Sequence, residues 1–216
     1  MKLLKDIKNI KGKTVIVRTD FNVPIQNNSV IDDFRIQKAL PTINFLRKKG
    51  AKIILISHIS AVGASLTPVA KYLSKIMPLH FSKEVLGKTT STLSQNLKNG
   101  EVLLLENLRN DTREEKNNKN FAVELARLGD PSMRRAGIYV NEAFPVCHRQ
   151  HASIVSLPKL LPHFAGFALV DEIKNLERVF NKPPHPFLFI LGGAKFHTKV
   201  PLLTKFAKIA DYIFIG

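Results

Sequence analysis

The sequence TVIVRTDFNVPIQNNSVIDDFR, residues 14 to 35, decides the fold of this chain. It begins with the apolar, β-branched run Val15 to Val17, in which apolar and polar residues do not alternate. Such a run is typical of a strand that is buried on both faces, as in a parallel sheet. Asp20 and Asn22 follow directly, so we expect them just past the carboxyl end of the strand, where open α/β sheets hold ligands.

The second half of this stretch predicts a turn and then a basic side chain. Pro24 cannot continue a central strand, and the polar run Gln26 to Ser29 is typical of a solvated turn before Val30. Arg35 closes the stretch, and a guanidinium binds carboxylate or phosphate through two parallel hydrogen bonds. Short polar side chains beside an arginine suit a small, hydroxylated, anionic ligand.

The same pattern of a buried run followed by polar residues recurs along the chain. The further strands expected before residue 167 are Lys52–Ile56, Leu79–Phe81, Val102–Leu105 and Ile138–Val140. His58 and Arg109 follow two of these runs, so they are expected at the same edge of the sheet as Asp20. Arg35 and Arg149 are expected on loops that converge there.

Helices are expected between these strands, and each has a sequence signal at one of its ends. The first predicted helix is Ala39–Lys49, with Pro41 in its first turn, and the second is capped by Thr67 and has Ile76 on its apolar face. The other predicted helices are Thr89–Leu97, Asn118–Leu128 and Val170–Phe180. The apolar segment Leu157 to Phe167 is broken by two prolines and Gly166, so we expect it to run over a surface or to close a domain.

These elements predict an α/β chain with a three-layer, Rossmann-like domain around a parallel sheet. We expect this domain over residues 1–167, a helix and hinge over 168–186, and an incomplete second βαβ unit over 187–216. Two parallel strands with one helix cannot cover a sheet on both faces, so the second unit should belong to a larger domain. The alternative is that residues 187–216 add two strands to the first sheet.

Composition limits the class of protein but does not identify a ligand. The 216 residues are 44% hydrophobic and carry a formal net charge of +16, which is compatible with a globular protein that binds phosphorylated or nucleic-acid ligands. The basic residues are mostly scattered lysines, without a recognisable nucleic-acid-binding module. The sequence has no apolar run of membrane-spanning length and no signal peptide. The lone Cys147 excludes an internal disulfide, which fits a reducing compartment. The expected location is therefore the cytoplasm.

Taken together, several motifs resemble the phosphoglycerate kinase family. The matching stretches are VRTDFNVP (17 to 24), DDFRI (32 to 36), ALPTI (39 to 43), GAKIILISH (50 to 58), LLLENLR (103 to 109), YVNEAF (139 to 144), HRQHAS (148 to 153) and LGGAK (191 to 195). They occur in unbroken order along essentially the whole chain. The resemblance covers only the N-terminal half of that family and the first part of its C-terminal half.

The resemblance implies a glycolytic kinase that transfers a phosphoryl group reversibly between 1,3-bisphosphoglycerate and ADP, giving 3-phosphoglycerate and ATP. It implies that the glycerate is bound by the residues matching the family's N-terminal motifs, namely Asp20, Phe21, Asn22, Arg35, His58, Arg109 and Arg149. It assigns the nucleotide to Gly192, Gly193, Lys195 and Lys199, with Arg35 and Lys199 as catalytic residues. The expected cofactor is ATP or ADP with Mg²⁺, whose metal ligand lies outside this chain. The expected partner is a missing C-terminal domain, in cis or in trans, with no membrane and no nucleic acid.

The sequence departs from the family pattern at several positions. An arginine is usual where Ala61 stands, and its loss is expected to weaken substrate binding by roughly 1.5 to 3 kcal/mol. The segment Pro131 to Gly137 is expected to be a surface insertion, and Phe196 to Thr198 replaces small and acidic residues. Because the family's remaining nucleotide-binding elements lie beyond Gly216, we expect no appreciable turnover from this chain alone. The alternatives are a non-catalytic remnant that binds anions or nucleic acid, and one half of a split kinase.

Overall fold

The computed structural model describes residues 1–60, 63–132, 137–181, 183–193 and 200–216. They form two compact units, Met1–Val170 and Asp171–Gly216. Across these described ranges, no helix is both long and apolar enough to cross a membrane. The finer division predicted from the sequence, with a hinge over 168–186, stays a prediction.

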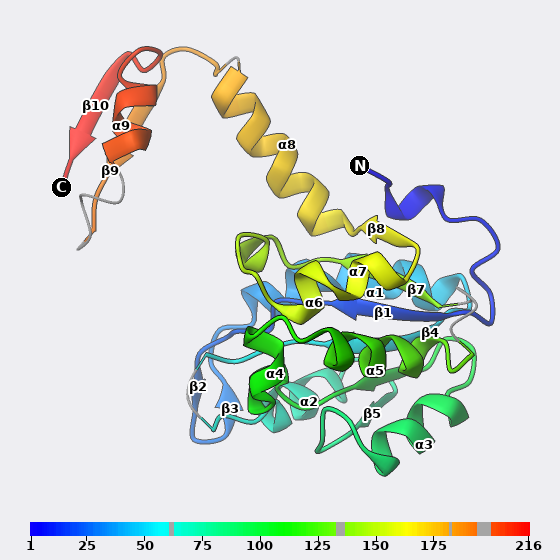
Figure 1. Cartoon of the computed structure of the whole chain (residues 1–216). Helices are drawn as coiled ribbons and strands as arrows, with labels where there is room; N and C mark the ends of the chain where they lie inside the picture. Colours follow the sequence, from blue (N-terminus) through cyan, green and yellow to red (C-terminus); the bar gives the residue numbers. More distant parts are fainter. Residues whose placement is uncertain (61–62, 133–136, 182, 194–199) are drawn as a thin grey trace. The chain divides into compact units, whose positions relative to one another are not determined.

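The first unit is built on a six-stranded sheet with the strand order β5-β6-β4-β1-β7-β8 (Figure 1). All five strand pairs are parallel. The strands are β1 (Thr14–Arg18), β4 (Lys52–Ile56), β5 (Leu79–Phe81), β6 (Val102–Leu104), β7 (Ile138–Asn141) and β8 (His163–Ala165). A short antiparallel hairpin, β2 (Ile25–Gln26) with β3 (Ser29–Val30), follows β1. The predicted α/β class with a parallel sheet is therefore confirmed.

Helices cover both faces of this sheet and complete three layers (Figure 1). The helices of the unit are α1 (Phe34–Lys48), α2 (Thr67–Leu73), α3 (Lys88–Asn96), α4 (Thr112–Glu115), α5 (Lys119–Gly129), α6 (Ala152–Val155) and α7 (Leu157–Leu160), with the 3₁₀ turns η1 (Leu4–Asp6), η2 (Leu108–Asn110) and η3 (Phe144–Val146). Val15 and Val17 pack with α1 and α2, whereas Ile16 packs with α5 on the opposite face. Because both faces of β1 are buried, its sequence needs no polar alternation.

Two predicted helices differ from the structure in where they begin or end. Helix α1 begins five residues before the predicted start, at Phe34, so Arg35 lies in its first turn instead of on a loop, and Pro41 lies in its interior. Helix α2 has Leu66 as its N-cap, not Thr67, and ends at Leu73, which leaves Ile76 exposed outside it. These predictions were wrong because the turn Asp32–Asp33 starts α1 early, and because the hydroxyl of Thr67 accepts no hydrogen bond from the α2 backbone.

The segment Leu157 to Phe167 was also predicted incompletely. It contains the helix α7 and then β8, which pairs with β7 and forms an edge of the sheet. Pro162 and Gly166 flank a strand of only three residues, so its sequence carries no extended apolar run. An edge strand needs a partner on one side only, which makes so short a strand possible.

The second unit contains β9 (Leu188–Leu191), α9 (Val200–Phe206) and β10 (Tyr212–Ile215). The two strands pair in parallel as a separate sheet, so the predicted βαβ unit is present and the alternative of two added strands is wrong. Phe206 is buried, and its ring lies 4.5 Å from the ring of Phe189, centroid to centroid. Helix α8 (Phe167–Asn181) begins in the first unit and continues into the second.

The chain topology places a switch point beside β1. From β1 the chain proceeds to β4 on one side of the sheet and returns later to β7 on the other side. In open α/β sheets the crevice at the carboxyl ends of such strands is the common place for a ligand. The residues that follow β1, β4, β6 and β7 are therefore the first to examine for a site.

Candidate functional site

Asp20 and Arg35 form an ion pair at the carboxyl end of β1. The Asp20 Oδ2 atom accepts a hydrogen bond from Arg35 Nη1 at 2.6 Å. Asp20 is buried, whereas the side chain of Arg35 is 45% exposed. The carboxylate therefore orients a guanidinium that still has free donor positions facing solvent, as a site for an anion requires.

A second chain of contacts links the ends of β1, β4 and β6. Asn22 Oδ1 accepts the backbone N–H of Ser60 at 2.9 Å. The hydroxyl of Ser60 accepts a hydrogen bond from Arg109 Nη1 at 3.2 Å. Arg109 Nε also lies 3.1 Å from Glu115 Oε1, so a carboxylate holds the other side of this guanidinium. Asn22 and Arg109, which are distant in the sequence, thus lie on either side of one serine.

His58 follows β4 by two residues and is buried. Its Nδ1 atom is 3.1 Å from Nη2 of Arg18, a buried arginine at the end of β1. Burial lowers the pKa of His58 to about 3, and the positive charges of Arg18, Arg109, His151 and Arg35 act in the same direction. His58 is therefore a neutral hydrogen-bonding group at physiological pH.

Arg18 is held by a buried polar network. Its Nε donates to Ser153 Oγ at 3.0 Å, and its Nη1 donates to the backbone oxygen of Thr19 at 2.5 Å. Ser153 donates in turn to Glu114 Oε1 at 2.5 Å. Burial lowers the pKa of Arg18, and the negative charge of Glu114 opposes that effect. Arg18 is therefore a buried cation in which each guanidinium nitrogen has a partner within the protein.

Glu106 and Asn107, in the segment that follows β6, fix the loop that follows β4. Glu106 accepts hydrogen bonds from Ser65 Oγ at 2.6 Å and from the backbone N–H of Leu66 at 2.7 Å. Asn107 binds both backbone groups of Ile59, with its Nδ2 3.1 Å from the oxygen and its Oδ1 3.2 Å from the nitrogen. These contacts hold the loop on both sides of residues 61–62. Ala61, where the family usually has an arginine, lies outside the described residues.

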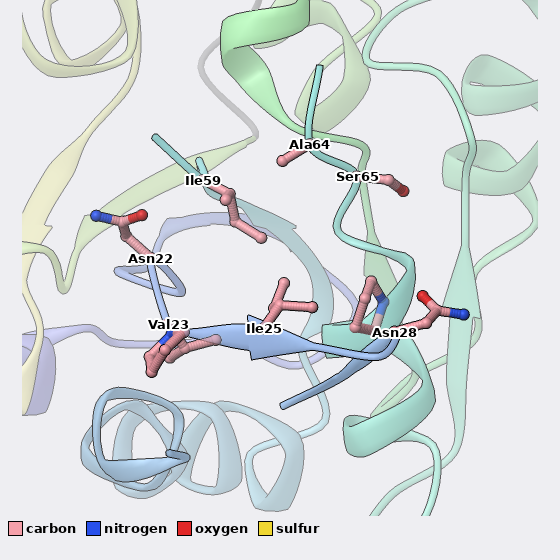
Figure 2. A pocket seen from close by; sticks show the side chains of 9 residues that line it. Asn22, Val23, Ile25, Asn28, Ile59, Ala64 and Ser65 are labelled. Carbon is pink, nitrogen blue, oxygen red and sulfur yellow. The ribbon is translucent and has the colours of Figure 1, made fainter. Parts of the chain in front are cut away.

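A cavity of about 510 Å³ lies beside this group of residues. Figure 2 shows its wall, in which the side chains of Ile25 and Ile59 point toward each other, near the segment that carries Ala64 and Ser65. Asn22 lines it, but Asp20, Arg35, His58, Arg109 and Arg149 do not. The cavity is largely apolar, so the charged residues, not this cavity, carry the chemistry suited to an anion.

Two further predicted site residues form no side-chain hydrogen bond or ion pair with this group in the described ranges. The ring of Phe21 is fully buried in the core, and its backbone N–H donates to Ser57 Oγ at 2.9 Å. Arg149 is exposed between η3 and α6, and no hydrogen bond or ion pair joins its guanidinium to another residue in the described ranges. Their binding roles stay predictions.

The predicted nucleotide-binding residues belong to the second unit. Gly192 and Gly193 follow β9 and are exposed, and Gly193 has a positive φ of 104°. Lys195 and Lys199 lie outside the described residues. Among the residues that the structure describes, no group of three His, Cys, Asp or Glu side chains could hold a metal ion. The described residues therefore do not form a metal site made wholly of such side chains.

The structure brings Asp20, Asn22, Arg35, His58 and Arg109 to the carboxyl edge of the sheet, as the sequence predicted. Sequence reasoning missed the supporting residues Ser60, Glu106, Asn107, Glu114 and Ser153. The positions of Glu106 and Asn107 directly after a buried strand were a usable signal. Glu114 and Ser153 gave none, because their importance depends on contacts with each other and with Arg18.

Comparison with protein families gives one match over nearly the whole chain. The family model "Phosphoglycerate kinase" matches residues 4–216. A phosphoglycerate kinase of Leptospira biflexa is 42% identical over 225 residues, covering 100% of this chain and 55% of that protein. One from Bartonella bacilliformis is 43% identical over 216 residues, covering 96% of this chain and 52% of that protein.

Solved structures agree with the sequence comparisons. The crystal structure of phosphoglycerate kinase from Pyrococcus horikoshii OT3 is similar with a TM-score of 0.88 at 28% identity, covering 100% of this chain and 55% of that one. The structure of phosphoglycerate kinase from Coxiella burnetii gives a TM-score of 0.81 at 29% identity, covering 100% and 54%. The chain spans about half the length of the curated relatives that it matches.

Proposed function

Since this chain belongs to the phosphoglycerate kinase family, we propose that its first unit binds 3-phosphoglycerate or 1,3-bisphosphoglycerate at the carboxyl edge of β1, β4 and β6. The observation that carries the proposal is the linked set of Asp20, Asn22, Arg35 and Arg109 at that edge. It combines two guanidinium groups for anionic ends with short polar side chains for a hydroxyl. A phosphorylated glycerate has both features.

Each residue has a distinct part in this proposal. Asp20 and Asn22 contact the hydroxyl and carboxylate end of the glycerate, and Arg35 contacts its carboxyl group. His58, Arg109 and Arg149 complete the basic site. Phe21 contributes through its backbone, because its ring is buried in the core. The geometry of Asp20 with Arg35 and of Ser60 with Arg109 supports these parts, because both guanidinium groups are oriented before a ligand arrives.

The reaction proposed for the complete site is reversible phosphoryl transfer between 1,3-bisphosphoglycerate and ADP. Arg35 and Lys199 stabilise the charge on the transferring group, and Gly192, Gly193 and Lys195 contact the nucleotide. Phosphoryl transfer depends chiefly on positioning and on positive charge, which these residue types supply. We expect the Mg²⁺ that accompanies ATP and ADP in this family to be bound in the second part of the enzyme.

The proposal includes a second part of the enzyme, supplied in the same polypeptide or by another chain. The chain spans about half the length of its relatives, and in the second unit Ile190 and Tyr212 are 63% and 66% exposed. Exposed apolar strands of a parallel sheet indicate an uncovered face. We therefore expect residues 1–216 alone to bind the glycerate without appreciable turnover, and a cytoplasmic location stays a prediction.

The test compares the glycerate with nucleic acid, because the net charge of +16 keeps nucleic acid as the second candidate ligand. The chain is titrated by calorimetry with 3-phosphoglycerate and with duplex DNA over a series of salt concentrations. Saturable binding of 3-phosphoglycerate supports the proposal. DNA binding that falls steeply with salt, without glycerate binding, would favour the basic-protein alternative. A coupled assay that detected turnover by residues 1–216 would contradict the need for a second part.

A further inference from the structure

We infer that Arg18 is a positioning residue, which holds His58 as the neutral tautomer with its proton on Nε2 and thereby makes it a fixed hydrogen-bond donor to the ligand. The inference rests on the proposed glycerate site, although its structural part can be tested without a ligand. Arg18 does not act on the ligand directly, because it is buried and each of its guanidinium nitrogens already has a partner within the protein.

The first step of the argument is the direction of the contact between the two side chains. A guanidinium has five N–H donors and no acceptor, so the atom opposite Arg18 Nη2 must accept. That atom is His58 Nδ1, at 3.1 Å, so Nδ1 carries no proton. In a neutral imidazole the proton then belongs to Nε2. Arg18 thereby selects one of two tautomers that are otherwise close in energy.

The second step is where the donor is directed. Nδ1 and Nε2 lie on different edges of the imidazole ring, so Nε2 points away from Arg18. No residue within the described ranges forms a hydrogen bond with Nε2, although His58 follows β4 at the edge where Asp20 and Arg109 gather. Nε2 is not among the buried side-chain atoms of the described residues that lack a partner, so this donor has access to solvent and is available to a ligand or water.

The third step concerns what keeps the His58 ring neutral and prevents it from rotating. Four charged or titratable groups act on His58, namely Arg18, Arg109, His151 and Arg35, and all four favour its neutral form. Arg18 itself is fixed by Ser153, whose hydroxyl is fixed by Glu114. Because each nitrogen of the buried Arg18 guanidinium already has a partner, Arg18 cannot turn to present a different atom without losing several hydrogen bonds.

This arrangement has a consequence for the ligand. A protonated His58 would attract any anion, whereas a neutral Nε2–H group donates one directional hydrogen bond. The arginines then supply the charge, and His58 selects for an acceptor oxygen at one position. Binding through His58 should therefore not depend on its titration between pH 5 and 8, where an ordinary histidine changes charge.

The test begins with ring-¹⁵N histidine NMR on the full chain without ligand. We expect His58 to show an unprotonated Nδ1 and a protonated Nε2 throughout pH 5 to 8, and its Nε2–H signal to shift when 3-phosphoglycerate is added. A protonated Nδ1, or a ring that titrates in this range, would overturn the inference. Arg18→Met should produce a mixture of tautomers, and the control Arg47→Met should not, because Arg47 contacts Asn44 and Gly100 instead.

A double-mutant cycle separates positioning from the simple loss of a charge. His58→Asn keeps an acceptor near the place of Nδ1 but removes the Nε2 donor, so it should weaken 3-phosphoglycerate binding about tenfold. Arg18→Met should weaken binding to a similar degree in the wild-type background and much less in the His58→Asn background. Additive effects would contradict the positioning role, because Arg18 would then act independently of His58.

Two further outcomes keep the inference distinct from the proposed function. If Arg18→Met does not fold, Ser153→Ala, which removes one bond to Arg18, takes its place in the same cycle. If the wild-type chain shows the expected tautomer but does not bind 3-phosphoglycerate, the proposed function fails and the role toward that ligand fails with it. If it binds while His58 has the opposite tautomer, only this inference fails.

Discussion

Arg35 Nη1 lies 2.6 Å from Asp20 Oδ2, an ion pair that joins the first turn of helix α1 to the end of strand β1. The two residues are 15 positions apart, and the β2–β3 hairpin lies between them. Because the arginine is 45% exposed, the pair contributes little to stability, about 0 to 1 kcal/mol as measured for surface pairs. Its main effect is to orient a guanidinium at the proposed glycerate site.

Replacing Arg35 should therefore separate binding from stability. We expect Arg35→Met to weaken 3-phosphoglycerate binding by about 1.5 to 3 kcal/mol, the range for hydrogen bonds to charged groups. The free energy of unfolding should fall by no more than about 1 kcal/mol. Calorimetric titration and urea unfolding measure the two effects, with Arg47→Met as the control for binding. An unchanged affinity would remove Arg35 from the site.

Arg149 gives a cleaner comparison, because its guanidinium forms no hydrogen bond or ion pair with another described residue. Arg149→Met should leave the free energy of unfolding within about 0.5 kcal/mol of the wild type. If Arg149 binds the ligand, the same variant should weaken 3-phosphoglycerate binding severalfold, and the loss should shrink at high salt. Titrations at low and high salt test this. Equal affinities for variant and wild type would show that Arg149 serves no binding role.

The contacts of Asn107 predict a coupled loss of stability and binding. Asn107 bonds to the backbone of Ile59, Ala64 and Arg109 and is buried, so Asn107→Ala leaves several buried backbone groups without a partner. We expect a loss of about 1 to 3 kcal/mol in urea unfolding and weaker glycerate binding, because the loop carries Ser60. The exposed Asn96→Ala is the matched control. If both variants behave alike, Asn107 does not support the loop.

The lowered pKa of His58 predicts that stability falls with pH in the acid range. In the unfolded chain the pKa of a histidine is about 6.5, whereas in the folded protein that of His58 is about 3. Between these values the unfolded state binds the extra proton, so the free energy of unfolding falls by up to about 1.4 kcal/mol per pH unit as the pH decreases. This contribution is complete above about pH 6.5 and is lost toward pH 3.

The measurement is urea unfolding of the wild type and of His58→Asn at several pH values across this window. Asn can still accept a hydrogen bond from Arg18 but does not titrate, so its curve should have a shallower slope. Other groups that titrate in this range act on both proteins equally, so the difference between the curves isolates His58. Parallel curves would show that His58 takes up its proton in the folded protein.

Much of the fold was predictable because the central strands are buried on both faces. Lys52–Ile56 was predicted with the bounds that the structure shows, since a continuous β-branched and aliphatic run has few other stable placements. Strand β8 was not predicted, because its three residues depend on pairing with β7 and not on their own composition. The early start of α1 was missed for a similar reason, and it moved Arg35 from a loop to a helix.

The candidate site was predictable only in its outer part. Asp20, His58 and Arg109 each follow a recognisable strand, and parallel strands bring their carboxyl ends to one edge. The supporting residues Glu114 and Ser153 lie far from Arg18 in the sequence, and only tertiary packing joins them. Their types are also common on surfaces, so no local pattern distinguishes them from solvated residues.

The most direct test of the account is amide chemical-shift mapping of the full chain during titration with 3-phosphoglycerate. The account predicts saturable shifts that concentrate at Asp20, Asn22, Ser60 and Arg109, where the ends of β1, β4 and β6 meet. It also predicts that glycerate without the phosphate gives much weaker shifts. Saturable shifts confined to other surfaces, or no shifts at ligand concentrations that saturate a full-length relative, would contradict it.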